Sequence, residues 1–512
     1  MELGIFGGTV ADGGTQRPQR ADVLVDEGRI VAVGSFSHVE TRRRLDATDA
    51  VVLPGFIDTH IHLDGWLAEG GTHEPTLRQG VTTAIVGQDG TSHFLGGPET
   101  VSEIGRYFAP INGPADFERR WTVAEYLDAV DQRSTLNVAA LVPHGNARHM
   151  VLGSRTTPAT AEERARIRGH VAEALEEGAV GVSTGLHYVP SRLADREELL
   201  AVSLEAAAAD VPHVTHMRGY GDQAATALEE MVDLAAASKA AFHISHLLAP
   251  PGVLARFDDA RQAGLDLTYD AYPYDAGFSV LTMFGLPEWA QEGDRRDILT
   301  RLSSPDARRR IDDWARQDGG RLRHLRLAHL GSPALAAYEG LTLERAAYRR
   351  QSTIGLTVCD LLLETDLDAS AIGPNGRTAD ELIALSSHPG YMAGSDGIYI
   401  GGSPHPRGWG AFARTIKMMV HDARRWDWSD VAHHLAAAPA RRFGLSDRGE
   451  LRPGLAADVV VMQPEDVADR ATYDDPTDLA AGARHVVVNG VPALVDGQVT
   501  GATPGRALRR LR

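Results

Sequence analysis

The chain has 512 residues, a mass of 55.0 kDa and a net charge of −18, from 51 Lys and Arg against 69 Asp and Glu. This acidity disfavours nucleic acid as a partner, because phosphate binding needs a basic surface. The single cysteine, Cys359, excludes an internal disulfide framework and a zinc site made only of thiolates. No apolar run is long enough to span a membrane, and the first residues do not resemble a targeting signal. We therefore expect a cytoplasmic protein that binds neither membrane nor nucleic acid.

Short strands separated by glycine and aspartate turns are predicted at both ends of the chain. Residues 21–34 form two apolar runs around an Asp-Glu-Gly turn, which is a hairpin signal. Residues 485–495 form two more runs around Asn-Gly, the dipeptide that most favours a tight hairpin. We predict one small β-sandwich domain built from residues 1–54 and 445–512.

Between these ends, residues 55–444 alternate short apolar runs with segments of helical period. One helix is expected over residues 161–177, because Gly178 is well suited to follow the last helical turn. Strand–helix units repeated over this length favour an α/β fold, a (β/α)8 TIM-like barrel. Such a barrel carries its chemistry where the strands end.

Histidines stand at several of these predicted strand ends. His60 and His62 are two residues apart, so in a strand their side chains face the same side. His216 and His246 each close a later apolar run, and Asp396 lies in a comparable place. Taken alone, either of the later two histidines is equally well explained as a core residue. Together the five residues predict a nitrogen and oxygen site for one or two divalent ions, with zinc as the natural choice.

A site of this kind suits the hydrolysis of an amide. A metal ion lowers the pKa of a bound water molecule towards neutrality and polarises a carbonyl oxygen. A neighbouring carboxylate accepts the proton and passes it to the leaving nitrogen. Asp396 is therefore the candidate general acid and base.

A series of motifs in a fixed order extends this pattern along the chain. They occupy residues 55–62, 79–83, 144–148, 181–190, 215–218, 244–246, 272–277, 394–397, 404–410, 439–445 and 449–458. In these segments the chain resembles the amidohydrolase superfamily and, within it, the D-aminoacylase (N-acyl-D-amino-acid deacylase) family. The resemblance implies a TIM-like barrel flanked by a small β-sandwich from both chain ends. It also implies hydrolysis of a linear amide in a small N-acyl-D-amino acid or related N-acyl amine; it leaves the oligomeric state open.

The resemblance assigns individual residues as well. It implies a metal shell of His60, His62, His216, His246 and Asp396, and substrate contacts from Tyr188, Ser279 and Arg407. The guanidinium of Arg407 suits a substrate carboxylate, which it can bind through two parallel hydrogen bonds.

Two positions depart from the family pattern. Asp89 stands where the family usually has a cysteine that ligates zinc, and its carboxylate is a harder ligand than a thiolate. We include Asp89 among the candidate ligands; the alternative is a turn residue before Gly90. Leu248 stands where the family has a lysine that aids carboxylate binding. The α-carboxylate of the substrate is then bound less strongly, masked or absent.

Two other functions are compatible with the same barrel. Cyclic-amide hydrolases of the hydantoinase or dihydroorotase kind usually carry a carboxylated lysine at a strand end, whereas Lys239 and Lys417 fall in helical or loop contexts. A catalytically silent barrel used for binding or assembly predicts losses scattered among the ligands, whereas every expected histidine and Asp396 are present.

Overall fold

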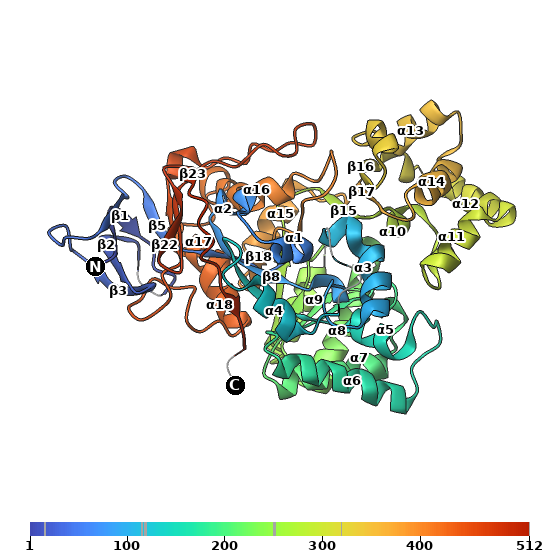
Figure 1. Cartoon of the computed structure of the whole chain (residues 1–512), viewed down its shortest axis with the longest axis horizontal. Helices are drawn as coiled ribbons and strands as arrows, with labels where there is room; N and C mark the ends of the chain where they lie inside the picture. The colour runs from blue at the N-terminus through green and yellow to red at the C-terminus, as the bar shows by residue number, and fades with distance from the viewer. Residues whose placement is uncertain (15–16, 114–115, 117–119, 249–251, 319, 511–512) are drawn as a thin grey trace.

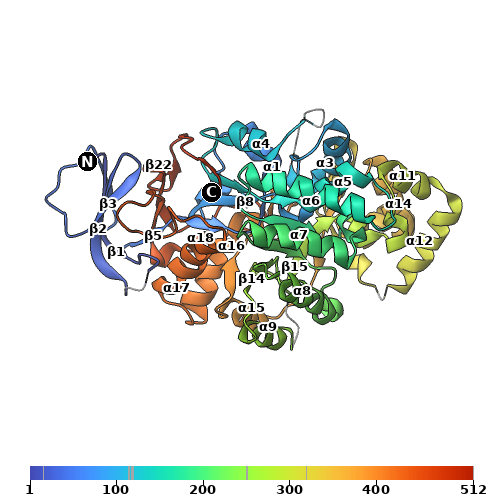
Figure 2. The same ribbon diagram turned by 90° about the horizontal axis from the view of Figure 1, so that it is seen from below.

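The computed structural model describes residues 1–14, 17–113, 116, 120–248, 252–318 and 320–510. A sheet that joins the two chain ends lies at one end of the molecule, a barrel at its centre and an inserted lobe at the other end (Figure 1). The view from below shows the same order, with helices α6, α7 and α8 beside the barrel strands (Figure 2). Within the described ranges, no helix is both long and apolar enough to cross a membrane.

Eight parallel strands form the barrel. In ring order they are β6 (Phe56–Asp58), β8 (Val81–Val86), β9 (Asn137–Ala140) continuing as β10 (Val142–Pro143), β11 (Val182–Gly185), β12 (His213–His216), β13 (Phe242–Ile244), β14 (Leu267–Ala271) and β18 (Tyr391–Ala393). The ring closes where β7 (Ile61–His62) pairs in parallel with β19 (Gly397–Ile398). The predicted TIM-like barrel is confirmed, and its short strands are buried throughout, as strands covered on both faces must be.

Helices follow most of the barrel strands. They are α1 (Asp64–Glu69), α2 (Glu74–Leu77), α3 (Pro98–Asn112), α4 (Val123–Val130), α5 (His144–Leu152), α6 (Ala161–Glu176), α7 (Arg196–Ala208), α8 (Ala224–Ser238), α9 (Val253–Gln262), α15 (Ala379–Ser386), α16 (Arg407–Ile416), α17 (Trp428–Ala432) and α18 (Ala438–Arg442). The helix predicted over residues 161–177 is α6. It begins at a capping box, in which Thr160 and Glu163 each bind the other's backbone N–H, so two otherwise unpaired donors are satisfied.

The two chain ends share one mixed sheet of nine strands. The N-terminal part supplies β1 (Leu3–Val10), β2 (Gln19–Asp26), β3 (Arg29–Gly34), β4 (Arg43–Asp46) and β5 (Val51–Pro54), and the C-terminal part supplies β20 (Val459–Met462), β21 (Ala483–Val488), β22 (Val491–Val495) and β23 (Gln498–Val499). Strands β5 and β20 join the halves, with Val52 opposite Val461. Both predicted hairpins are present, and Asn489 and Gly490 have the positive φ that a tight hairpin turn needs. The boundaries at residues 54 and 445 stay a prediction; β24 (Ala507–Leu508) pairs with β9 of the barrel.

A lobe that the sequence patterns did not separate from the barrel is inserted between β14 and β18. Its antiparallel sheet contains β15 (Ala276–Val280), β16 (Arg326–Leu330) and β17 (Ala369–Pro374), and its helices are α10 (Leu281–Gly285), α11 (Arg295–Ser303), α12 (Pro305–Gln317), α13 (Leu343–Arg350) and α14 (Ile354–Glu364). The lobe has its own apolar core, which includes Cys359. Burial raises the pKa of the Cys359 thiol to about 11, so this thiol is protonated at neutral pH.

Candidate metal centre

The six predicted ligands meet at the carboxyl ends of the barrel strands. His60 and His62 follow β6, Asp89 lies in the turn after β8, His216 ends β12, His246 follows β13 and Asp396 follows β18. Their exposed fractions lie between 0% and 7%. Residues far apart in the sequence therefore form one buried cluster, at the end of the barrel where such folds carry their chemistry.

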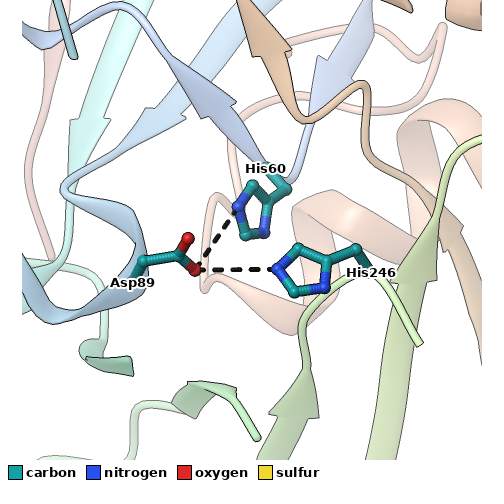
Figure 3. Close-up of side chains that lie close together, drawn as sticks. All are labelled: His60, Asp89 and His246. Carbon is teal, nitrogen blue, oxygen red and sulfur yellow. Dashed lines mark ion pairs between the residues drawn. The ribbon is translucent and has the colours of Figure 1, made fainter. Parts of the chain in front are cut away.

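The Asp89 carboxylate lies within 4 Å of all four histidines. Its Oδ1 is 3.7 Å from His60 Nε2 and 3.8 Å from His246 Nε2 (Figure 3). Its Oδ2 is 3.6 Å from His216 Nδ1 and 3.9 Å from His62 Nε2. Asp89 does occupy a turn before Gly90, but that turn directs its carboxylate at the histidine cluster.

Asp396 approaches the same nitrogens of His60 and His62 as Asp89 does. Its Oδ1 is 3.3 Å from His62 Nε2 and 3.8 Å from His60 Nε2. The ligand atoms of His60, Asp89 and His246 fall within 4.8 Å of one another, and so do those of His60, His62 and Asp396. Either of these two groups, which share His60, could therefore hold an ion.

These distances fit a metal ion better than direct hydrogen bonds. Most exceed hydrogen-bond length, and they resemble the roughly 3.4 Å between two ligand atoms on a tetrahedral zinc ion. Within the described residues, both ring nitrogens of His60, His216 Nδ1 and Asp89 Oδ1 are buried without a hydrogen-bond partner. Buried polar atoms are seldom left so, and imidazole nitrogen with carboxylate oxygen is a donor set that zinc accepts.

The electrostatics of the cluster also favour a cation. Burial alone would lower the pKa of His60, but the carboxylates of Asp270, Asp89 and Asp396 raise it to about 9. Three buried carboxylates thus surround one imidazole, which stabilises positive charge at this point.

Three of the candidate ligands have an uncommon backbone conformation. The φ angles of Asp89, His246 and Asp396 are +57°, +35° and +49°. Residues with a side chain rarely adopt this region, and it persists only where surrounding structure holds it. Asp58 supplies part of that support, since its carboxylate accepts backbone N–H groups from His60 and Ser395 at 3.2 and 2.9 Å. Burial raises the pKa of Asp58 to about 7.

Other side chains orient the histidines, and most of them were not identified from the sequence. Asn112 Oδ1 lies 2.8 Å from His62 Nδ1. Asp270 Oδ2 lies 3.6 Å from His60 Nδ1 and 2.9 Å from His243 Nε2, and its Oδ1 accepts the backbone N–H of His246. Asp270 closes an apolar run, as His216 and His246 do, and this pattern could have revealed it. Asn112, at the end of α3, gave no such signal.

Two of the three predicted substrate contacts lie beside the candidate ligands. A cavity of about 1080 Å³ is lined by Tyr188 and Ser279 together with five of the six candidate ligands. The Tyr188 hydroxyl and Ser279 Oγ are 2.9 Å apart. The remaining wall is mixed: one part is apolar and includes Leu248, Phe278, Met283, Phe284 and Trp314. Another part carries charged side chains, namely Arg192, Arg218, Asp222, Glu288, Glu292 and Arg321.

Arg407 is fully buried just behind the cavity wall, where its guanidinium lies 4.5 Å from the ring centre of the wall residue Tyr272. Its Nη1 has no hydrogen-bond partner among the described residues, and its contact with substrate stays a prediction. Its Nη2 lies 2.9 Å from Asp396 Oδ2, and its Nε donates to the Asp396 carbonyl oxygen at 2.5 Å. Burial alone would raise the pKa of Asp396, but Arg407 and the neighbouring histidines hold it well below its ordinary value. Arg407 thus keeps Asp396 ionised.

The two lysines lie outside the cluster. Lys239 follows the last residue of α8, and Lys417 follows α16 and pairs with Asp422 at 2.7 Å. Neither stands at a barrel strand end, so the bridging lysine typical of cyclic-amide hydrolases has no counterpart among the described residues.

A closed barrel with buried histidines and aspartates at its strand ends defines the class of metal-dependent barrel hydrolases. The family model described as "Amidohydrolase family" matches residues 43–283 and 260–493, and the chain belongs to this family.

Three relatives are similar over nearly the whole chain. The N-acyl-D-glutamate deacylase of Alcaligenes xylosoxydans xylosoxydans is 35% identical over 100% of this chain and 97% of its own. The D-aminoacylase of the same organism is 32% identical over 100% and 98%. The crystal structure of N-acyl-D-glutamate deacylase from Bordetella bronchiseptica, complexed with zinc and a phosphonate mimic of the tetrahedral intermediate, is 31% identical. It covers 99% of each chain with a TM-score of 0.83. The chain is therefore a D-aminoacylase-like amidohydrolase.

Proposed function

We propose that the protein is a zinc-dependent deacylase of N-acyl-D-amino acids or related N-acyl amines. The observation that carries this proposal is the buried cluster of four histidines and two aspartates, which opens into a cavity beside Tyr188 and Ser279. The names of the full-length relatives point to the same bond, a linear amide.

One or two zinc ions would be held by His60, His62, Asp89, His216, His246 and Asp396. Bound there, zinc would supply Lewis-acid activation of a water molecule and of the amide carbonyl. Asp89 takes the place of a thiolate ligand and, facing all four histidines, is positioned to serve either group of ligands.

The remaining chemistry belongs to the side chains. Asp396, kept ionised by Arg407, accepts a proton from the attacking water as the new C–O bond forms. It then returns that proton to the amide nitrogen as the C–N bond breaks, which releases the amine and the carboxylic acid. The Tyr188 hydroxyl, oriented by Ser279, is placed to donate a hydrogen bond to the amide oxygen as negative charge develops there.

The experiment is a substrate screen with added zinc. N-acetyl and N-formyl derivatives of D- and L-amino acids, their decarboxylated amines and cyclic amides such as hydantoins are compared. We expect turnover of the linear D-amides, and we expect Asp396→Asn to abolish it while most of the zinc is retained. Turnover of cyclic amides alone, absence of turnover by a zinc-loaded and folded protein, or full activity of Asp396→Asn would each contradict the proposal.

A further inference from the structure

His187 is a polar residue of the cavity wall that the proposed mechanism does not use. It follows β11, directly precedes Tyr188, and is half-buried. Its Nδ1 lies 3.3 Å from Nε2 of the candidate ligand His216. The His187 ring makes no other hydrogen bond within the described ranges, so its polar contact is with the candidate metal centre.

The two ring nitrogens of His216 face different partners. Its Nδ1 lies 3.6 Å from Asp89 Oδ2 and is buried without a hydrogen-bond partner, whereas its Nε2 faces His187. A nitrogen that binds a metal carries no proton, so binding through Nδ1 requires the proton of His216 to be on Nε2. An ordinary histidine is neutral at about pH 8, with one donor and one acceptor nitrogen. His187 Nδ1 can therefore accept the His216 Nε2 proton.

The aromatic packing around His216 does not by itself select this orientation. The ring centre of His216 lies 4.8 Å from that of Tyr188, 4.9 Å from that of Tyr220 and 4.6 Å from that of His246. These contacts restrict the ring, but a half-turn about its Cβ–Cγ bond leaves its outline almost unchanged. The half-turn replaces both nitrogens by ring carbons, so it breaks the hydrogen bond to His187 and moves Nδ1 away from Asp89. The hydrogen bond therefore distinguishes two orientations that packing treats alike.

We propose that His187 is a positioning residue, which accepts the Nε2 proton of His216 and so keeps His216 Nδ1 directed at the metal centre. This inference rests on the metal centre of the proposed function and adds the residue that fixes one of its ligands. His187 takes no part in the proton transfers.

The test separates the hydrogen bond of His187 from its packing. His187→Phe keeps a ring beside Tyr220, whose ring centre is 5.9 Å away, and removes the acceptor. His187→Gln loses the ring but keeps a side-chain oxygen that can accept the proton. His170→Phe, on α6 and half-buried like His187, is the matched control for the loss of one histidine.

Three measurements at pH 8 are compared between these variants and wild type. Zinc affinity is measured by competition with a chromophoric chelator. The visible absorption spectrum of the cobalt-loaded protein reports the ligand geometry around the ion. Values of kcat and KM are measured for an N-acyl-D-amino acid at saturating zinc.

We expect His187→Phe to bind zinc about 10- to 100-fold more weakly, the range for losing a group that orients a metal-bound histidine. Its cobalt spectrum changes, and kcat falls with little change in KM, because the defect lies in the metal centre and not in substrate binding. His187→Gln keeps most of the wild-type zinc affinity and cobalt spectrum, and His170→Phe equals wild type.

Two other roles of His187 predict different results. A packing role predicts the reverse order, with zinc affinity kept in His187→Phe and lost in His187→Gln. A role in contacting substrate predicts unchanged zinc affinity in every variant and a raised KM. Either result overturns the inference. If His187→Phe does not fold, the comparison of His187→Leu with His187→Gln decides in its place. If wild type binds zinc but hydrolyses no linear amide, the proposed function fails, and the zinc affinities still decide this inference.

Discussion

Substitution of Asn112 tests whether His62 is a metal ligand. Asn112 contacts His62 at Nδ1, the ring nitrogen that points away from Asp89 and Asp396. His62 faces Asp396 and Asp89 through Nε2, so its Nδ1 carries the proton and donates to Asn112 Oδ1 at 2.8 Å. The Asn112 amide donates in turn to the Thr91 carbonyl at 3.2 Å. Asn112→Leu preserves the approximate volume and removes the acceptor.

The size of the effect follows from these contacts. A buried ring N–H left without an acceptor costs about 1–3 kcal/mol. Loss of an orienting partner of a metal-bound histidine typically weakens metal binding by about 10- to 100-fold, or about 1.4–2.7 kcal/mol. Both routes predict zinc binding weaker by one to two orders of magnitude in Asn112→Leu.

The assay is a competition for zinc between the protein and a chromophoric chelator. Asn112→Asp is the matched control, because it keeps an acceptor for His62 while losing the donor to Thr91. We expect its zinc affinity to equal or exceed that of wild type. Unchanged affinity in a folded Asn112→Leu variant, or equal losses in both variants, would refute the argument that His62 binds metal through Nε2.

Three further predictions concern the same centre and its support. Because carboxylates including Asp270 outweigh burial and raise the pKa of His60 to about 9, zinc binding at pH 7–8 should release about one proton. Zinc affinity should then rise by up to about tenfold per pH unit and level off above pH 9. Calorimetry in buffers of different ionisation enthalpy measures the zinc affinity and the number of protons released. Zinc binding without proton release would contradict this prediction. The Asp89→Cys variant should still bind zinc and should prefer zinc over manganese more strongly than wild type does, since a thiolate is a softer ligand than a carboxylate. Metal analysis after loading with both ions measures this preference. An unchanged preference would contradict the assignment of Asp89 as a ligand. Glu198→Gln should lower the free energy of unfolding by about 3–5 kcal/mol in urea titrations, because it leaves the buried Arg148 guanidinium without its carboxylate; a loss below 1 kcal/mol would show that this ion pair is not a major support.

The fold was predictable wherever local pattern and turn chemistry agree. Short apolar runs alternating with capped helices indicated the barrel, and Asn489-Gly490 indicated a hairpin because few residues adopt its positive φ angles. The histidines could be proposed because a strand-end position and a two-residue spacing give them a shared direction. The inserted lobe escaped detection because its helices have the same period and length as those of the barrel.

The remaining features of the site depend on contacts between distant segments, which a single sequence does not contain. Arg407 had the chemistry of a carboxylate binder, but whether it faces substrate or Asp396 is decided by how α16 meets β18. Asn112 supports His62 from 50 residues away.

The barrel and the inserted lobe supply different parts of the site. The candidate ligands stand on barrel strands and their turns, whereas Met283, Phe284 and Trp314 reach the cavity from the lobe, which has its own apolar core. Substitutions in that wall can alter which substrate side chain or acyl group is accepted without moving a metal ligand. Changes at these three wall positions could therefore alter selectivity while the metal ligands stay in place, whereas replacing the whole lobe would also remove Ser279, the partner of the Tyr188 hydroxyl.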